Sequence, residues 1–205
     1  MTTFVLVHGA WHGGWCWRHV SRALRAAGHD VFTPTLTGLG ERSHLLTPEV
    51  DLRTHVRDVL AVLEFEDLTD VVLVGHSYAG MVVTGVAAQA ADRLRRVVVL
   101  DGFLPERGEE ALRLLPPDTA AHYRDSAADP GEGWWVPPRP VEAFGVTDPE
   151  VGRWLAGKLV RHPFTTYTQP SEHGASDLTV PAAYLLCAGW ATRFRPMAER
   201  AAALG

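Results

Sequence analysis

Short apolar runs alternate with stretches of helical periodicity in the first half of the chain. The strand-like runs cover residues 4–8, 31–33, 71–74 and 97–100. Between them, apolar residues recur at helical spacing over residues 19–27, 52–65 and 78–94. Continuous apolar strands separated by helices predict an α/β fold with a mostly parallel, doubly wound sheet that helices cover on both faces.

The alternation breaks after residue 104. Residues 105–170 hold 10 of the 14 prolines and several large aromatic side chains, including Trp134 and Trp135. Long connections in compact domains are usually functional or disordered, so this stretch predicts either a cap over a site or a partly ordered excursion with an incidental hydrophobic cluster. If the two tryptophans lie on an extended segment they face opposite ways, and at most one of them lines a pocket.

The strand and helix pattern resumes near the end of the chain. An apolar run at residues 183–187 predicts a strand, and a helix with proline in its first turn follows it to about residue 204. The predicted organisation is a core of residues 1–104 and 181–205 with a cap insertion at residues 105–180.

A candidate nucleophile lies where a predicted strand meets a predicted helix. Residues 75–80 read Gly-His-Ser-Tyr-Ala-Gly, which is close to the Gly-x-Ser-x-Gly turn that projects a serine from the carboxyl edge of a sheet. The second glycine falls one place late, at Gly80, and Ala79 stands in its usual position, where a methyl group is small enough for the crossing. The pattern predicts Ser77 as a nucleophile, and the alternative is a serine in an ordinary turn.

A second motif follows the first predicted strand. Residues 8–15 read His-Gly-Ala-Trp-His-Gly-Gly-Trp. Acyl transfer needs two backbone N–H groups near the developing oxyanion, and the two motifs offer those of Ala10 and Tyr78. A phosphate-binding loop is the alternative, but neither Gly-Lys-Ser/Thr nor Gly-x-Gly-x-x-Gly is present.

These two motifs, together with Thr-Pro-Thr-Leu-Thr-Gly-Leu-Gly-Glu-Arg at residues 33–42, support a resemblance. The chain resembles the α/β-hydrolases of the plant methyl esterase and hydroxynitrile lyase group, and most of all their bacterial esterase-like relatives. The resemblance implies a Ser–His–acid hydrolase that needs no cofactor or metal and acts on a small ester under an aromatic cap. It assigns Ser77 as nucleophile and Ala10 and Tyr78 to the oxyanion hole. Trp11, Trp134 and Trp135 are our own candidates for the substrate pocket.

The acid and the base depart from the pattern of that group. The strand at residues 183–187 is not followed by an Asp-bearing turn, and the acid assigned instead is Asp101, at the end of the strand after the nucleophile strand. The alternative for Asp101 is a polar residue that closes the strand.

In that group the general base is a histidine in a Gly-His turn after the last strand, and no strand with such a turn follows the predicted helix that ends at about residue 204. We therefore expect the protein to continue past Gly205 with a strand and a histidine that serves as general base. His12 and His173 are the substitutes within the chain, His8 and His76 belong to turn motifs, and His55 is interpreted as a helix-surface residue. A complete protein that has lost hydrolysis is the alternative.

Composition bears on the partners and the location that we expect for the protein. The net charge of −5 gives no electrostatic basis for nucleic-acid binding. No apolar run approaches the ~20 residues of a membrane span, and the first strand does not resemble a signal peptide. Two distant cysteines form neither a disulfide framework nor a zinc site, so a cytoplasmic location is expected, and a homodimer is left open.

The same site could support other chemistry. Lyase, lactonase, thioesterase and acyltransferase activities are alternatives, as is a non-catalytic small-molecule binder. Hydroxynitrile cleavage in the resembled group needs a lysine in the pocket, and Lys158 is the only lysine, so the lyase ranks below the esterase.

Overall fold

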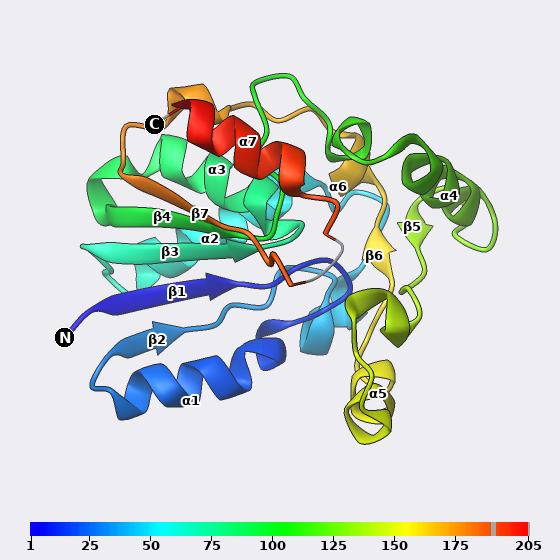
Figure 1. The fold of residues 1–205 in the computed structure, drawn as a ribbon, viewed down its shortest axis with the longest axis horizontal. Coiled ribbons are helices and arrows are strands. Elements are labelled where there is room, and N and C mark those ends of the chain that lie inside the picture. Colours follow the sequence, from blue (N-terminus) through cyan, green and yellow to red (C-terminus); the bar gives the residue numbers. More distant parts are fainter. Residues whose placement is uncertain (190–191, 205) are drawn as a thin grey trace.

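A five-stranded parallel sheet forms the centre of the protein. The computed structural model describes residues 1–189 and 192–204. The strands lie in the order β2-β1-β3-β4-β7 and all neighbours are parallel (Figure 1). Their bounds are β1 (Thr3–Val7), β2 (Asp30–Phe32), β3 (Val71–His76), β4 (Leu94–Leu100) and β7 (Ala182–Leu185). The predicted doubly wound α/β sheet is confirmed.

Helices cover both faces of this sheet. The core helices are α1 (Arg18–Ala26), α2 (Leu52–Phe65), α3 (Ala79–Gln89) and α7 (Arg195–Leu204). Successive residues of β1 point to opposite faces of the sheet. Leu6 packs with Trp17 and Val31 near α1, whereas Val5 and Val7 belong to the larger core under α2 and α3. Such alternation follows from the two-residue period of a strand.

The predicted element boundaries differ most from the structure between α3 and β4. The predicted helix over residues 78–94 ends at Gln89, a 3-10 turn follows at Ala91–Arg93, and β4 already begins at Leu94. The first residues of β4 include exposed arginines, so the strand is longer than its continuous apolar run. The apolar pattern therefore predicts only the second half of β4, where the side chains are more buried.

Residues 105–180 form an insertion between β4 and β7. It contains α4 (Pro117–Ala128), α5 (Pro149–Ala156), α6 (Thr165–Thr168) and an antiparallel pair of β5 (Trp135–Val136) with β6 (His162–Pro163). Figure 1 shows these elements at the end of the sheet to which the strands point. The insertion therefore lies beside the strand ends that carry the sequence motifs. No helix in the described part of the chain is long and apolar enough to cross a membrane.

The late glycine of the nucleophile motif has a structural reason. A β-carbon built on Gly80 would lie 1.9 Å from the carbonyl oxygen of Phe103, so α3 passes directly against the segment after β4. Ala79 is fully buried in the core, and its methyl group is accommodated. The close approach to the segment after β4 therefore falls at residue 80, which is where this motif has its second glycine.

We expect Gly80→Ala to destabilise the fold, although alanine normally favours a helix over glycine. The added methyl group would meet the Phe103 backbone, and overpacking of this kind costs about 1–3 kcal/mol. Gly157→Ala is the matched control, because nothing lies closer than 3.7 Å to its added β-carbon. Urea unfolding measures both variants, and equal free energies of unfolding would contradict the packing argument.

Candidate active site

Three residues that follow strands of the sheet have an unusual backbone conformation and line one cavity. Trp11 after β1, Ser77 after β3 and Asp101 after β4 have φ angles of 64°, 55° and 41°, in the left-handed region that residues with a β-carbon rarely adopt. All three line a cavity of about 610 Å³. Strained residues of this kind are typical of functional sites, so the cavity is the candidate active site.

The turn at Ser77 is held through its own backbone. The Ser77 N–H donates to the Leu100 carbonyl at 3.2 Å, and the Ser77 carbonyl accepts from the N–H groups of Gly80 and Phe103 at 3.1 Å each. A β-carbon on Gly102 would lie 2.6 Å from that carbonyl oxygen. The serine is therefore fixed between β3, α3 and the segment after β4, with its side chain at the cavity.

Two buried N–H groups lie beside this turn without an internal partner. The backbone N–H groups of Ala10 and Tyr78 make no hydrogen bond within residues 1–189 and 192–204, and both residues are buried. Buried N–H groups normally have partners. Their availability next to Ser77 suits an oxyanion hole, in which they bind the substrate oxygen.

Histidines fix the peptide that carries the Ala10 N–H. The Nε2 atom of His8 accepts from the Leu36 N–H at 3.1 Å, so the proton of the neutral ring is on Nδ1, which donates to the Gly9 carbonyl at 2.8 Å. That carbonyl belongs to the same peptide as the Ala10 N–H. Because the peptide is planar and trans, holding its carbonyl oxygen also directs its N–H. Burial lowers the pKa of His8 to about 3, so the ring is neutral at pH 7.

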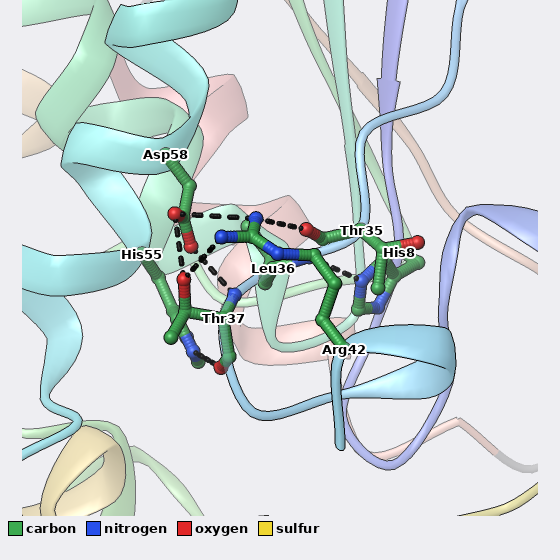
Figure 2. A network of polar contacts seen from close by, with 7 residues as sticks. All are labelled: His8, Thr35, Leu36, Thr37, Arg42, His55 and Asp58. Atoms are coloured by element: carbon green, nitrogen blue, oxygen red, sulfur yellow. Dashed lines mark hydrogen bonds and ion pairs between the residues drawn. The ribbon is translucent and has the colours of Figure 1, made fainter. Parts of the chain in front are cut away.

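Tyr78 is held in a similar way through its side chain. The Nε2 atom of His55 donates to the Thr37 carbonyl at 2.9 Å, which leaves Nδ1 to accept from the Tyr78 hydroxyl at 2.9 Å. Figure 2 shows how Asp58 and Arg42 fix Thr37. The prediction that His55 is a helix-surface residue is wrong, because its face of α2 packs on the core and the ring is fully buried.

Asp101 accepts two hydrogen bonds at the edge of the cavity. Its carboxylate oxygens take the N–H of Cys187 at 3.2 Å and the hydroxyl of Thr192 at 2.9 Å, while its backbone N–H bonds to Leu185. Asp101 is therefore tied to the segment after β7. It lines the same cavity as Ser77, as an acid of a catalytic triad must, and its role as that acid stays a prediction.

No imidazole in the described residues hydrogen-bonds to the Ser77 hydroxyl. His12 and His76 line the cavity, but Nδ1 of His12 bonds to the Ala10 carbonyl at 2.7 Å. Burial lowers the pKa of His76 to about 4. His173 lies at a separate surface recess with Arg53. The prediction of a general base beyond Gly205 stays a prediction.

The walls of the cavity differ from those predicted. Trp11 lines it as expected, but neither Trp134 nor Trp135 does. Trp135 lies in β5 with the Arg161 guanidinium 4.1 Å from its ring centroid, so pairing of β5 with β6 directs it away. The aromatic wall instead consists of Phe103, Tyr123, Phe144, Tyr167 and Phe194, with Arg139 and Arg193 beside them.

The sequence signal for these wall residues was weak. They come from five separate segments, and no motif marks any of them. The buried His162 was also missed, because a histidine before a proline in an irregular segment has no pattern that distinguishes it from an exposed loop residue. Only the folding of the insertion onto the core brings these side chains together.

Comparison with known proteins agrees with this geometry. Residues 4–205 match the model of the alpha/beta hydrolase family, and the chain belongs to that family. It is 45% identical over 199 residues to the carbendazim hydrolyzing esterase of Nocardioides sp. (strain SG-4G), over 93% of this chain and 81% of that protein. Salicylic acid-binding protein 2 of Nicotiana tabacum is 36% identical over 107 residues, which are 50% of this chain and 40% of that protein.

Solved structures show the same fold. An extracellular alpha/beta-hydrolase from a Paenibacillus species has a TM-score of 0.78 at 23% identity, over 91% of this chain and 77% of the other. Tomato methylketone synthase I has a TM-score of 0.73 at 17% identity, over 89% and 77% of the two chains. The predicted fold and family are confirmed, the protein is a hydrolase, and its relatives support ester hydrolysis.

We expect the free energy of unfolding to fall as the pH is lowered from about 6.5 towards 3. His8 stays neutral in the folded protein because burial lowers its pKa to about 3, whereas in the unfolded chain it binds a proton below its ordinary pKa of about 6.5. The unfolded state then binds more protons, so acid favours it. Urea unfolding at a series of pH values measures the slope.

The exposed His19 provides the control for this titration. His19→Gln should leave the pH dependence unchanged, because its side chain lies exposed on α1 and is not part of the buried network around His8. A free energy of unfolding that stays constant between about pH 7 and pH 5 would contradict a neutral, buried His8.

Proposed function

We propose that the protein hydrolyses a small carboxylic ester through an acyl-enzyme on Ser77. The observation that carries the proposal is the strained turn at Ser77. Two backbone N–H groups next to it make no hydrogen bond within the described residues: that of Ala10, which lines the same cavity, and that of Tyr78, which follows Ser77. A serine presented in this way and flanked by an oxyanion hole is the arrangement of serine hydrolases in this fold.

The steps follow from the geometry. The Ser77 oxygen attacks the ester carbonyl and passes its proton to a general base, while the N–H groups of Ala10 and Tyr78 stabilise the negative oxygen. The intermediate collapses, the alcohol leaves with the proton from the base, and water then releases the acid by the same route. Asp101 orients the general base in this proposal.

The cavity favours an aromatic substrate beneath a cap. Its volume of about 610 Å³ lies within the usual range for small-molecule sites. Aromatic side chains form a large part of its wall, namely those of Trp11, Phe103, Tyr123, Phe144, Tyr167 and Phe194. The 45% identical relative is named for hydrolysis of carbendazim, a small aromatic methyl carbamate. We therefore propose aromatic methyl esters and carbamates as the substrate class, with the insertion at residues 105–180 acting as the cap.

The lyase alternative loses support. Lys158 does not line the Ser77 cavity; its ammonium group lies 5.7 Å from the ring centroids of both Trp15 and Trp154. A cation at this distance is attracted by the faces of the two rings. A lyase that needs a lysine beside the substrate is therefore not favoured by the geometry.

Ser77→Ala in the full-length protein should abolish turnover of a chromogenic aromatic ester and of carbendazim. Loss of the nucleophile of a triad lowers kcat by roughly a million-fold, with a residual rate from the oxyanion hole. Ser21→Ala is the matched control, since Ser21 is buried, its hydroxyl donates to the Arg18 carbonyl in α1, and it does not line the Ser77 cavity. A fluorophosphonate probe should add its mass to the Ser21 variant and not to the Ser77 variant; wild-type turnover by Ser77→Ala would refute the proposal.

Asp101→Asn should lower kcat by about 10⁴-fold with little change in KM, because an acid fixes the tautomer of the base and stabilises the imidazolium. Asparagine keeps the acceptor for the Thr192 hydroxyl or the Cys187 N–H, so the fold should persist. Asp70→Asn, which removes only a surface pair with Arg95, is the control. Steady-state kinetics and circular dichroism test the variants, and a kcat within tenfold of wild type would exclude Asp101 as the acid.

A further inference from the structure

The insertion contacts the loop after β1 that carries Ala10 and Trp11. The Nδ1 atom of His162 in β6 accepts from the Trp11 N–H at 3.4 Å, and the Val160 N–H donates to the Trp11 carbonyl at 3.1 Å. The Trp11 indole also donates to the Val136 carbonyl at 3.3 Å. Trp11 follows Ala10, whose N–H is a proposed oxyanion donor, and has the left-handed φ of 64°. The segment that must hold this strained turn is therefore the insertion.

The hydrogen bonds around His162 determine its tautomer. The Thr166 hydroxyl donates its single proton to the Pro163 carbonyl at 2.7 Å. The contact of 2.8 Å between His162 Nε2 and the Thr166 oxygen must then be donated by His162, since a hydroxyl has one donor. The proton of the neutral ring is on Nε2, and Nδ1 is left with the lone pair that accepts from Trp11. Complete burial lowers the pKa of His162 well below its ordinary value, which keeps this state at neutral pH.

The two peptide groups that flank Ala10 have two carbonyl groups and two N–H groups, and histidine side chains hydrogen-bond to three of these four. His8 holds the Gly9 carbonyl, His12 holds the Ala10 carbonyl at 2.7 Å and His162 holds the Trp11 N–H. The remaining group is the Ala10 N–H. The ring of His162 also lies 4.7 Å from that of Tyr78, centroid to centroid and edge to face. One side chain of the insertion thus contacts the residues on both sides of the proposed oxyanion hole.

We propose that His162 is a positioning residue, which sets the Ala10–Trp11 peptide so that the neighbouring Ala10 N–H points at the substrate oxygen. The proposal rests on the proposed esterase function. In this proposal the oxyanion hole is complete only when the insertion is packed against the loop after β1. Loss of the contact misaligns a donor that acts mainly in the transition state, so it lowers kcat more than it raises KM.

The test compares two variants at position 162 in the full-length protein. His162→Leu removes the acceptor, whereas His162→Gln retains one acceptor and one donor. Removing an oxyanion donor costs roughly 10²–10³ in kcat, and we expect a misaligned one to cost about tenfold or more. The leucine variant should therefore lose at least about tenfold in kcat with KM within about twofold of wild type, and the glutamine variant should recover most of that loss.

Leu155→Ala is the control for a weakened insertion. Leu155 is buried in α5 and does not line the cavity, so this variant should lower the melting temperature without lowering kcat. If kcat follows the melting temperature through all three variants, or if His162→Leu keeps the wild-type kcat, the positioning role is wrong. Absence of turnover by the wild-type protein would instead refute the esterase proposal.

A measurement on the wild-type protein remains decisive if the leucine variant does not fold. In the ¹⁵N spectrum of histidine-labelled protein, the His162 signals are assigned by their loss in His162→Gln. Nδ1 should have the shift of an unprotonated ring nitrogen and Nε2 that of a protonated one. The opposite tautomer would overturn the proposal, because a protonated Nδ1 cannot accept from Trp11.

Discussion

The left-handed turns at the carboxyl ends of three parallel strands are the constraint on which the site depends. At Trp11, Ser77 and Asp101 the chain leaves the sheet with a positive φ, which costs of order 1–3 kcal/mol at each residue. The surrounding backbone has to offset that cost. It does so at Ser77 through three backbone hydrogen bonds, and the same bonds hold the serine at the cavity.

Two neutral histidines, His8 and His55, connect these turns to the loop that follows β2. Leu36 and Thr37 lie on one loop, which Arg42 and Asp58 fix (Figure 2), and its backbone determines the tautomers of His8 and His55. A charged imidazole in either place would lose an accepted hydrogen bond and lie unsolvated in the core, which is unfavourable. The polar network is therefore stable because each ring is neutral and has both nitrogens occupied.

The insertion contributes to the site in two ways. Its side chains form much of the aromatic wall of the cavity, and its short strand β6 contacts the backbone of Trp11. A segment with these two roles can change substrate preference through the wall while the contact at His162 keeps the catalytic geometry. This division agrees with the general rule that function in a common fold is determined by its connecting segments.

The sequence by itself determined the parallel sheet, the turn at Ser77 and the loop at Ala10. These features depend on local patterns: continuous apolar runs, glycines at tight turns and a serine at fixed spacing. It did not reveal that His55 and His162 are buried, or that Trp135 is directed away from the cavity. Those outcomes depend on which face of α2 packs on the core and on how β6 pairs with β5. Contacts between segments distant in the chain leave no local periodicity, so only the tertiary structure could decide them.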